Sequence, residues 1–165
     1  TPNNADQHAL LVKQQIEGLE DPDPDDDFEG MRQYLDSIPE YAETPIWITE
    51  IAVHVGYETD FFSNPLVPVS DYQYDKMSDY LLTLLDWLEA NADANNIEKW
   101  FFYRTWKDIV NVGGDGYMGI IFFDTPATGA PLNCLGEALR ARALQYLDPP
   151  PPKVKCDSAG NTVPE

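Results

Sequence analysis

The sequence predicts an α/β fold in which helices alternate with strands. From residue 28 onward the expected order is helix, strand, helix, strand, helix, which implies βαβ units and parallel strand pairing. Of the 165 residues, 43% are hydrophobic and 12% aromatic, which is enough apolar material for a packed core. Because two parallel strands alone cannot form a covered sheet, we expect this chain to be part of a larger α/β fold.

Four helices are expected from the spacing of the apolar residues. They span residues 5–20, 28–37, 71–93 and 131–146. The third is the clearest, because its apolar side chains recur every three or four residues and therefore fall on one face of a helix. These side chains belong to Tyr74, Met77, Leu81, Leu84, Leu85 and Leu88.

Two segments have the near-continuous apolar character that is typical of parallel strands buried on both faces. The first, residues 44–53, is bounded by Pro45 and rich in β-branched residues. The second, residues 100–106, reads WFFYRTW, and a short extended run follows at 119–124. Glu50 is the carboxylate that interrupts the apolar run of the first strand.

The charge of the chain limits its partners. Ten Lys and Arg residues oppose 29 Asp and Glu residues, which gives a formal net charge of −19. Binding of nucleic acid depends on neutralising phosphates, so we expect no nucleic acid partner and no anionic membrane surface. Neutral sugars fit this charge, as do many other ligands. The sequence contains no run of ~18 apolar residues, and therefore no membrane span is expected.

The two cysteines favour a disulfide over a metal site. Cys134 and Cys156 lack CxxC spacing and obvious histidine partners, so no metal ligands are predicted. A disulfide between them is plausible in a secreted protein, and two free thiols are the alternative. Four consecutive prolines after Asp148 form a stiff spacer. We therefore expect a domain at residues 1–147 and a proline-rich linker or tail at residues 148–165.

Two side chains at the predicted strand ends are candidates for chemistry. A carboxylate such as Glu50 at the C-terminal end of a buried strand is costly to bury without compensation, which favours a functional role. A structural pairing with a nearby arginine is the alternative. Trp106 ends the next strand at the same face, and its flat ring suits the C–H faces of sugars. A packed core aromatic is the alternative for Trp106.

The segment PIWITE, the helix after it and the strand WFFYRTW resemble the seventh and eighth strands of clan A glycoside hydrolases. The resemblance covers about residues 28–146 and implies the C-terminal portion of a TIM (β/α)8 barrel, incomplete in this chain. In that superfamily the seventh strand ends in the nucleophilic glutamate, which matches Glu50. The eighth ends near a tryptophan that lines the cleavage subsite, which matches Trp106. The later stretch GIIFFDTPATGAPLNCLGEAL is similar to the closing pattern of such barrels.

The resemblance implies retaining chemistry, which needs a nucleophile and an acid/base carboxyl group about 5–5.5 Å apart. In the family the acid/base is usually the glutamate of an Asn-Glu pair at the end of strand four. This sequence contains no Asn-Glu dipeptide. We therefore expect the acid/base to lie in the remaining N-terminal part of the barrel, outside this chain, and the chain alone to be inactive.

Three further residues are candidate substrate contacts. His54 follows the Glu50 strand, Tyr57 lies in the aromatic loop after it, and Tyr103 belongs to the second strand. Loop structure or barrel packing is the alternative for each. We therefore expect a secreted retaining glycoside hydrolase acting on a polysaccharide or oligosaccharide, with no metal or organic cofactor. A non-catalytic carbohydrate-binding or structural protein derived from such a barrel is the main alternative, and an unrelated α/β domain is the third.

Overall fold

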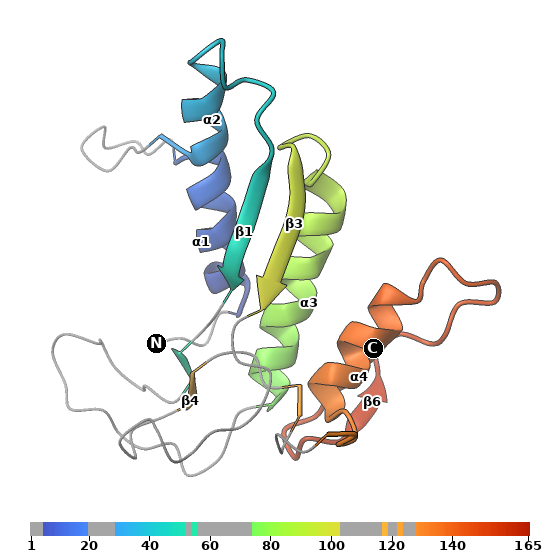
Figure 1. Cartoon of the computed structure of the whole chain (residues 1–165). Coiled ribbons are helices and arrows are strands. Elements are labelled where there is room, and N and C mark those ends of the chain that lie inside the picture. The colour runs from blue at the N-terminus through green and yellow to red at the C-terminus, as the bar shows by residue number, and fades with distance from the viewer. Residues whose placement is uncertain are drawn as a thin grey trace, which may run out of the picture.

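The computed structural model confirms the α/β class of the chain (Figure 1). Of its helices, none within the described residues has both the length and the apolarity needed to cross a bilayer. The described residues are 5–19, 29–51, 54–55, 74–102, 117–118, 122–123 and 128–165.

Helices α1 (Ala5–Glu17) and α2 (Met31–Asp36) confirm the first two predicted helices. Gly18 directly follows α1, and its φ of +88° belongs to the left-handed region that glycine favours at a helix end. Gly30 caps α2, and its backbone N–H donates to the Gln33 side chain at 3.0 Å. The backbones of Gly18 and Gly30 lie so close that a Cβ on Gly30 would be 2.1 Å from the Gly18 nitrogen. The two helix ends therefore meet at a glycine–glycine contact.

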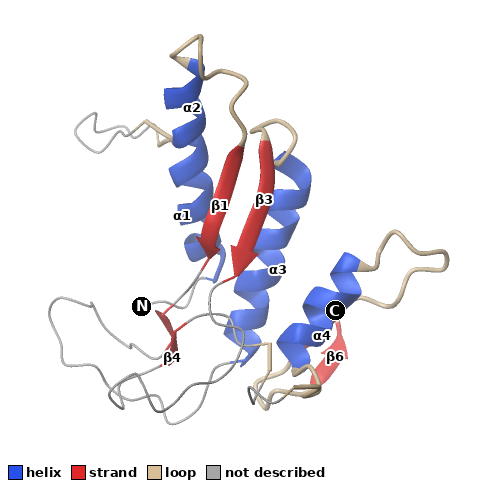
Figure 2. Cartoon of the chain, in the orientation of Figure 1, coloured by secondary structure: helices blue, strands red, loops and turns tan. Residues whose placement is uncertain are grey.

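Strands β1 (Ile46–Ile51) and β3 (Ile97–Phe102) form a parallel pair, as the sequence predicted (Figure 2). Helix α3 (Tyr74–Asn91) connects the two strands in sequence and packs against α1. The core contains Ile16 of α1, Leu81 of α3, Ile46 of β1 and Ile97 of β3. One face of the strand pair is thus buried under helices.

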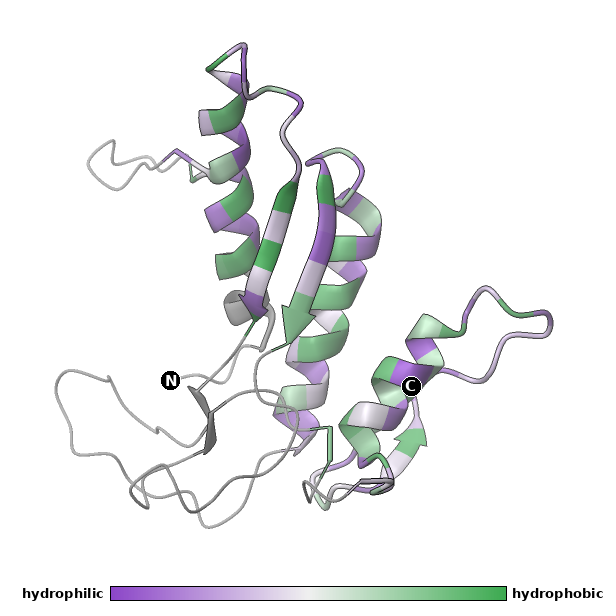
Figure 3. Cartoon of the chain, viewed as in Figure 1, coloured by the Kyte–Doolittle hydropathy of each residue, from purple (hydrophilic) through white to green (hydrophobic). Residues whose placement is uncertain are grey.

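The opposite face of the pair is open, so the described residues bury only one of the two faces that the sequence pattern predicts to be buried. Trp47 is 52% exposed and Phe101 is 49% exposed, although Ile46 and Ile51 are buried. Hydrophobic and hydrophilic residues accordingly mix along both strands (Figure 3). The reason is that, among the described residues, the packed elements α1 and α3 lie on one side only.

Helix α4 (Cys134–Ala143) confirms the last predicted helix and begins at an asparagine cap. The Asn133 side chain accepts a hydrogen bond from the Gly136 backbone N–H at 3.1 Å. After the prolines, β5 (Val154–Cys156) and β6 (Thr162–Pro164) pair as an antiparallel hairpin that contacts α4 and α3. Residues 148–165 therefore contain secondary structure of their own, which the sequence did not reveal.

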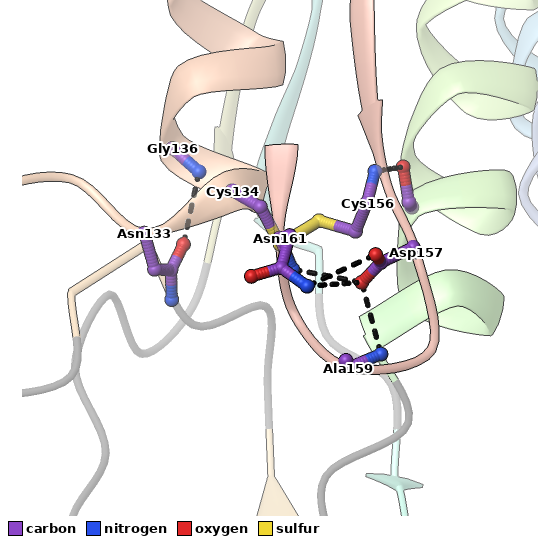
Figure 4. Close-up of a disulfide and its surroundings, with 8 residues drawn as sticks. Asn133, Cys134, Gly136, Cys156, Asp157, Ala159 and Asn161 are labelled. Carbon is purple, nitrogen blue, oxygen red and sulfur yellow. Dashed lines mark hydrogen bonds between the residues drawn. A yellow bond between two sulfur atoms is a disulfide. The ribbon is translucent and has the colours of Figure 1, made fainter. Parts of the chain in front are cut away.

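The predicted disulfide between Cys134 and Cys156 is confirmed, and it joins the hairpin to the start of α4 (Figure 4). The Cys156 backbone N–H also donates to the buried hydroxyl of Ser78 on α3 at 3.0 Å. In the hairpin turn, the Asp157 carboxylate accepts hydrogen bonds from the Asn161 side chain and backbone, which hold the pKa of this carboxyl below its usual value. The disulfide thus fixes the hairpin to α4, and the hydrogen bond to Ser78 fixes it to α3.

Candidate active site

Strand β1 places Glu50 near its C-terminal end, as the sequence predicted. Glu50 is the penultimate residue of the strand, directly before Ile51, which is 2% exposed and part of the core. Glu50 itself is exposed on the strand. The expectation that the Glu50 carboxylate is buried was therefore wrong for this chain, because the open face of the strand pair leaves the carboxylate in contact with water.

The register between β1 and β3 is irregular at Glu50. Ile48 pairs with Trp100 and Ile51 pairs with Phe102, so two residues of β1 oppose the single residue Phe101 of β3. Those two residues are Thr49 and Glu50, and both are exposed, whereas a regular strand would alternate. This is the geometry of a β-bulge, a feature common beside active sites because it re-aims a side chain.

The described residues contain no salt bridge to Glu50. The arginines described there pair with other carboxylates: Arg32 with Asp36, Arg140 with Glu137, and Arg142 with Asp86 and Glu89. The structural alternative for Glu50 was a pairing with a nearby arginine, and none of these three provides it. The carboxylate is thus free of an arginine partner within this part of the chain.

Trp47 shares the open face with Glu50 and is held by β3. Its indole N–H donates to the Glu98 carboxylate at 2.9 Å. The Lys99 ammonium group lies 4.3 Å from the centre of the Trp47 ring, which is a cation–π contact. These two contacts engage the polar edge and one face of the indole, so Trp47 ties the two strands together on this side.

A second, short strand pair follows the Glu50 strand. Strand β2 (His54–Val55) pairs antiparallel with β4 (Tyr117–Met118), and His54 is the register partner of Met118. This places the backbone of the candidate residue His54 three residues beyond the end of β1. The structure does not describe the His54 side chain, and Tyr57, Tyr103 and Trp106 lie outside the described residues.

A surface depression lies elsewhere on the molecule. Its lining residues come from α1, α2 and the segment just before α2, and they are Gln15, Glu29, Gly30, Met31 and Tyr34. No residue of β1 or β3 contributes to it. Within the described ranges, no three His, Cys, Asp or Glu side chains gather in a way that could hold a metal ion. Glu50 on the bulge remains the best candidate for chemistry.

The family model described as "Glycosyl hydrolase catalytic core" matches residues 25–119. The match covers more than half of the chain and includes β1, α3 and β3. The chain belongs to the glycosyl hydrolase catalytic core family. Membership supports a glycoside hydrolase-like function with a carbohydrate as substrate. Comparison with curated proteins gives no significant match, and comparison with solved structures gives none either.

Within this glycosyl hydrolase catalytic core, the matched segment contains Glu50 and its bulge, whereas α4 and the disulfide-bonded hairpin follow it. Sequence reasoning found Glu50 but missed Phe101, the residue that opposes it across the bulge. The signal was present in the run WFFY: if Trp100 and Phe102 face the core, strand alternation turns Phe101 to the other side.

Proposed function

We propose that the protein is a retaining glycoside hydrolase that cleaves a polysaccharide or oligosaccharide, with Glu50 as the nucleophile. The observation that carries this proposal is an exposed glutamate on a bulge at the C-terminal end of a parallel strand, inside the segment that matches the family. A nucleophilic carboxylate must be ionised and must project from a rigid element. Glu50 is exposed near the end of β1, and the strand supplies the rigidity.

The proposed reaction is a double displacement. Glu50 attacks the anomeric carbon while the acid/base carboxyl protonates the departing glycosidic oxygen, which leaves a sugar ester on Glu50. The acid/base then takes a proton from water, the water attacks the same carbon, and Glu50 leaves as a carboxylate. We assign the acid/base to a part of the protein outside this chain, and we propose Trp106, His54, Tyr103 and Tyr57 as substrate contacts.

We further propose that β1 and β3 are the seventh and eighth strands of a TIM barrel of the clan A type. Parallel sheets are covered on both faces, whereas Trp47 is about half exposed on the open face of this pair. The N-terminal part of the barrel, outside this chain, is the proposed partner of that face around Trp47, and the C-terminal end of β1 that carries Glu50 stays open to the substrate. The chain alone would then lack both the acid/base and the closed barrel, and we expect it to be inactive.

A secreted location is part of the proposal. The disulfide between Cys134 and Cys156 supports it, because disulfides persist in oxidising compartments and are rare in the cytosol. A net charge of −19 is compatible with an extracellular, neutral polysaccharide as substrate. We propose no metal and no organic cofactor, since two carboxyl groups suffice for this mechanism.

The test is Glu50→Gln in the full-length protein that carries this segment. The change keeps the shape of the side chain and removes its charge, so we expect turnover to fall about 10³-fold or more while carbohydrate affinity survives. A 2-fluoro glycoside suited to the substrate should label Glu50 in the unaltered protein. Turnover and the labelled peptide are measured by hydrolysis assay and mass spectrometry.

Glu43→Gln is the matched control, because Glu43 is an exposed glutamate just before the same strand, at its opposite end. Labelling at a carboxylate outside TPIWITEIAV, or near-normal turnover in Glu50→Gln, would rule out the nucleophile assignment. Carbohydrate binding without any turnover in the unaltered protein would favour the non-catalytic carbohydrate-binding alternative.

A further inference from the structure

Phe101 lies opposite Glu50 in the strand register. The single residue Phe101 faces the two-residue bulge of Thr49 and Glu50, and it is 49% exposed. Because the bulge and Phe101 occupy the same end of the parallel pair, the aromatic side chain and the carboxylate belong to one small region of the open face. Nothing in the proposed mechanism yet uses this side chain.

The neighbours of Phe101 show which way it faces. The Phe102 ring packs edge-on against Phe122, with ring centres 5.5 Å apart and planes at 80°. Phe122 is buried, and both Trp100 and Phe102 pack against the core. Side chains alternate along a strand, so Phe101 must point away from the helices and onto the face that carries Glu50.

Phe101 and Trp47 are both about half exposed, but they differ in the partners that their rings have within the described residues. Trp47 is engaged by Glu98 at its N–H and by Lys99 over its ring. For Phe101, the described residues supply no ring stacking or cation contact of this type. A hydrophobic ring left half exposed beside a carboxylate has apolar surface to offer a ligand. The apolar C–H face of a sugar ring is a ligand of matching shape and chemistry.

We propose that Phe101 is a sugar-binding platform: a positioning residue that stacks on a ring of the substrate and holds it beside Glu50. The inference rests on the proposed function and narrows its substrate to neutral sugars. Glu50 is an exposed carboxylate beside this platform, and the chain carries a net charge of −19, so uronic-acid polymers would be repelled.

The test compares Phe101→Ala and Phe101→Trp in the full-length protein. Affinities for cellotetraose, laminaritetraose, xylotetraose and mannotetraose are measured by calorimetry in a Glu50→Gln background, and KM and kcat are measured with Glu50 intact. For the tetrasaccharide that binds, we expect Phe101→Ala to raise Kd and KM about tenfold. Phe101→Trp should stay within about threefold of the parent protein, because it keeps a flat apolar ring.

Tyr34→Ala is the matched control, since Tyr34 is also 49% exposed but lies on α2, and its removal should leave Kd and KM unchanged. Unchanged Kd and KM in Phe101→Ala would overturn the proposal. A second result would also overturn the proposal. In it, Phe101→Trp fails to restore affinity, and Phe101→Ala and Phe101→Trp both lower the unfolding midpoint. Phe101 would then be covered by protein instead of by a sugar. Normal turnover in Glu50→Gln overturns only the assignment of Glu50 as the nucleophile. If the unaltered protein neither binds nor hydrolyses any of these sugars, both the proposed function and the Phe101 platform are overturned.

Discussion

Gly30 shows how a single residue can decide whether two helices fit together. Its φ of −75° and ψ of 161° suit any amino acid, so backbone conformation does not require glycine there. The requirement is steric, because a Cβ would meet the backbone of Gly18 at 2.1 Å and that of Glu17 at 2.5 Å. Backbone atoms cannot move aside as a flexible side chain can. The meeting of α1 and α2 therefore depends on the missing side chain.

We predict that Gly30→Ala lowers the free energy of unfolding by about 3 kcal/mol, because the two helices must separate to admit the methyl group. Gly129→Ala is the control. Gly129 has a φ of +78°, but a Cβ added there would meet no atom within 4 Å, so only the left-handed backbone is penalised, by about 1 kcal/mol. Urea unfolding followed by circular dichroism measures both, and equal losses would contradict the steric argument.

Tyr80 links stability to alkaline pH. It is 4% exposed, and burial raises the pKa of its phenol to about 12, from about 10 in the unfolded chain. Below pH ~10 both states are protonated and Tyr80 adds no pH dependence. Between about pH 10 and pH 12 only the unfolded state loses the proton, so stability should fall with rising pH. Urea unfolding at pH 9 and pH 11 measures this fall in stability, and the fall should be smaller in Tyr80→Phe. An identical fall in Tyr80→Phe would show that Tyr80 is not its cause.

Helices α3 and α4 are joined by the buried Arg142. Its side chain, 4% exposed, pairs with Asp86 and with Glu89, the latter at 3.2 Å, and both carboxylates lie on α3. The two carboxylates are more than half exposed, which limits the electrostatic gain. The apolar part of Arg142 fills the space between the helices, so its packing contributes as well as its charge.

We predict that Arg142→Ala costs about 2–3 kcal/mol of stability, because it removes a buried side chain together with both ion pairs. Arg140→Ala provides the control on the same helix. Arg140 is 60% exposed and pairs with Glu137 one turn away, an arrangement worth less than about 0.5 kcal/mol. Thermal and urea unfolding compare the two, and a loss in Arg140→Ala as large as that in Arg142→Ala would argue against the interhelix role.

The elements that the sequence predicted are those with strong apolar periodicity. Helix α3 has a continuous buried face from Met77 to Leu88, and its pattern was unambiguous. Strand β3 begins at Ile97, three residues before the expected start, because Glu98 and Lys99 resemble a loop in sequence. In the structure they lie on the open face and engage Trp47, which is a tertiary contact that a local pattern does not contain.

The candidate site was predictable only where a local sequence pattern marks it. Glu50 stands out because it interrupts an apolar strand, and its position at the strand end follows from the sequence. The bulge depends on how Thr49 and Glu50 align with Phe101, and that register is a property of two paired strands. The hairpin after Pro152 also escaped prediction, because its strands are three residues each and are held by a disulfide and by Ser78.

At the scale of the whole molecule, the C-terminal hairpin is connected to the rest by a few specific contacts. Cys156 is linked covalently to Cys134, and its backbone N–H donates to Ser78. Gly160 of the turn lies against the ring of Tyr74, the first residue of α3, where a Cβ would approach within 2.9 Å. These contacts lie at the N-terminal half of α3, so losing them should loosen that part of the core.

We predict that replacing both cysteines with alanine lowers the free energy of unfolding by about 3 kcal/mol. The disulfide closes a loop between residues 22 positions apart, and the chain-entropy model gives this value for a loop of that length. Because both cysteines are 3% exposed, dithiothreitol should reduce the bond only when the hairpin or the whole chain opens. The reduced unaltered protein is the control and should match the double variant in urea unfolding. A double variant as stable as the oxidised protein, or rapid reduction under native conditions, would show that the hairpin is not held in this way.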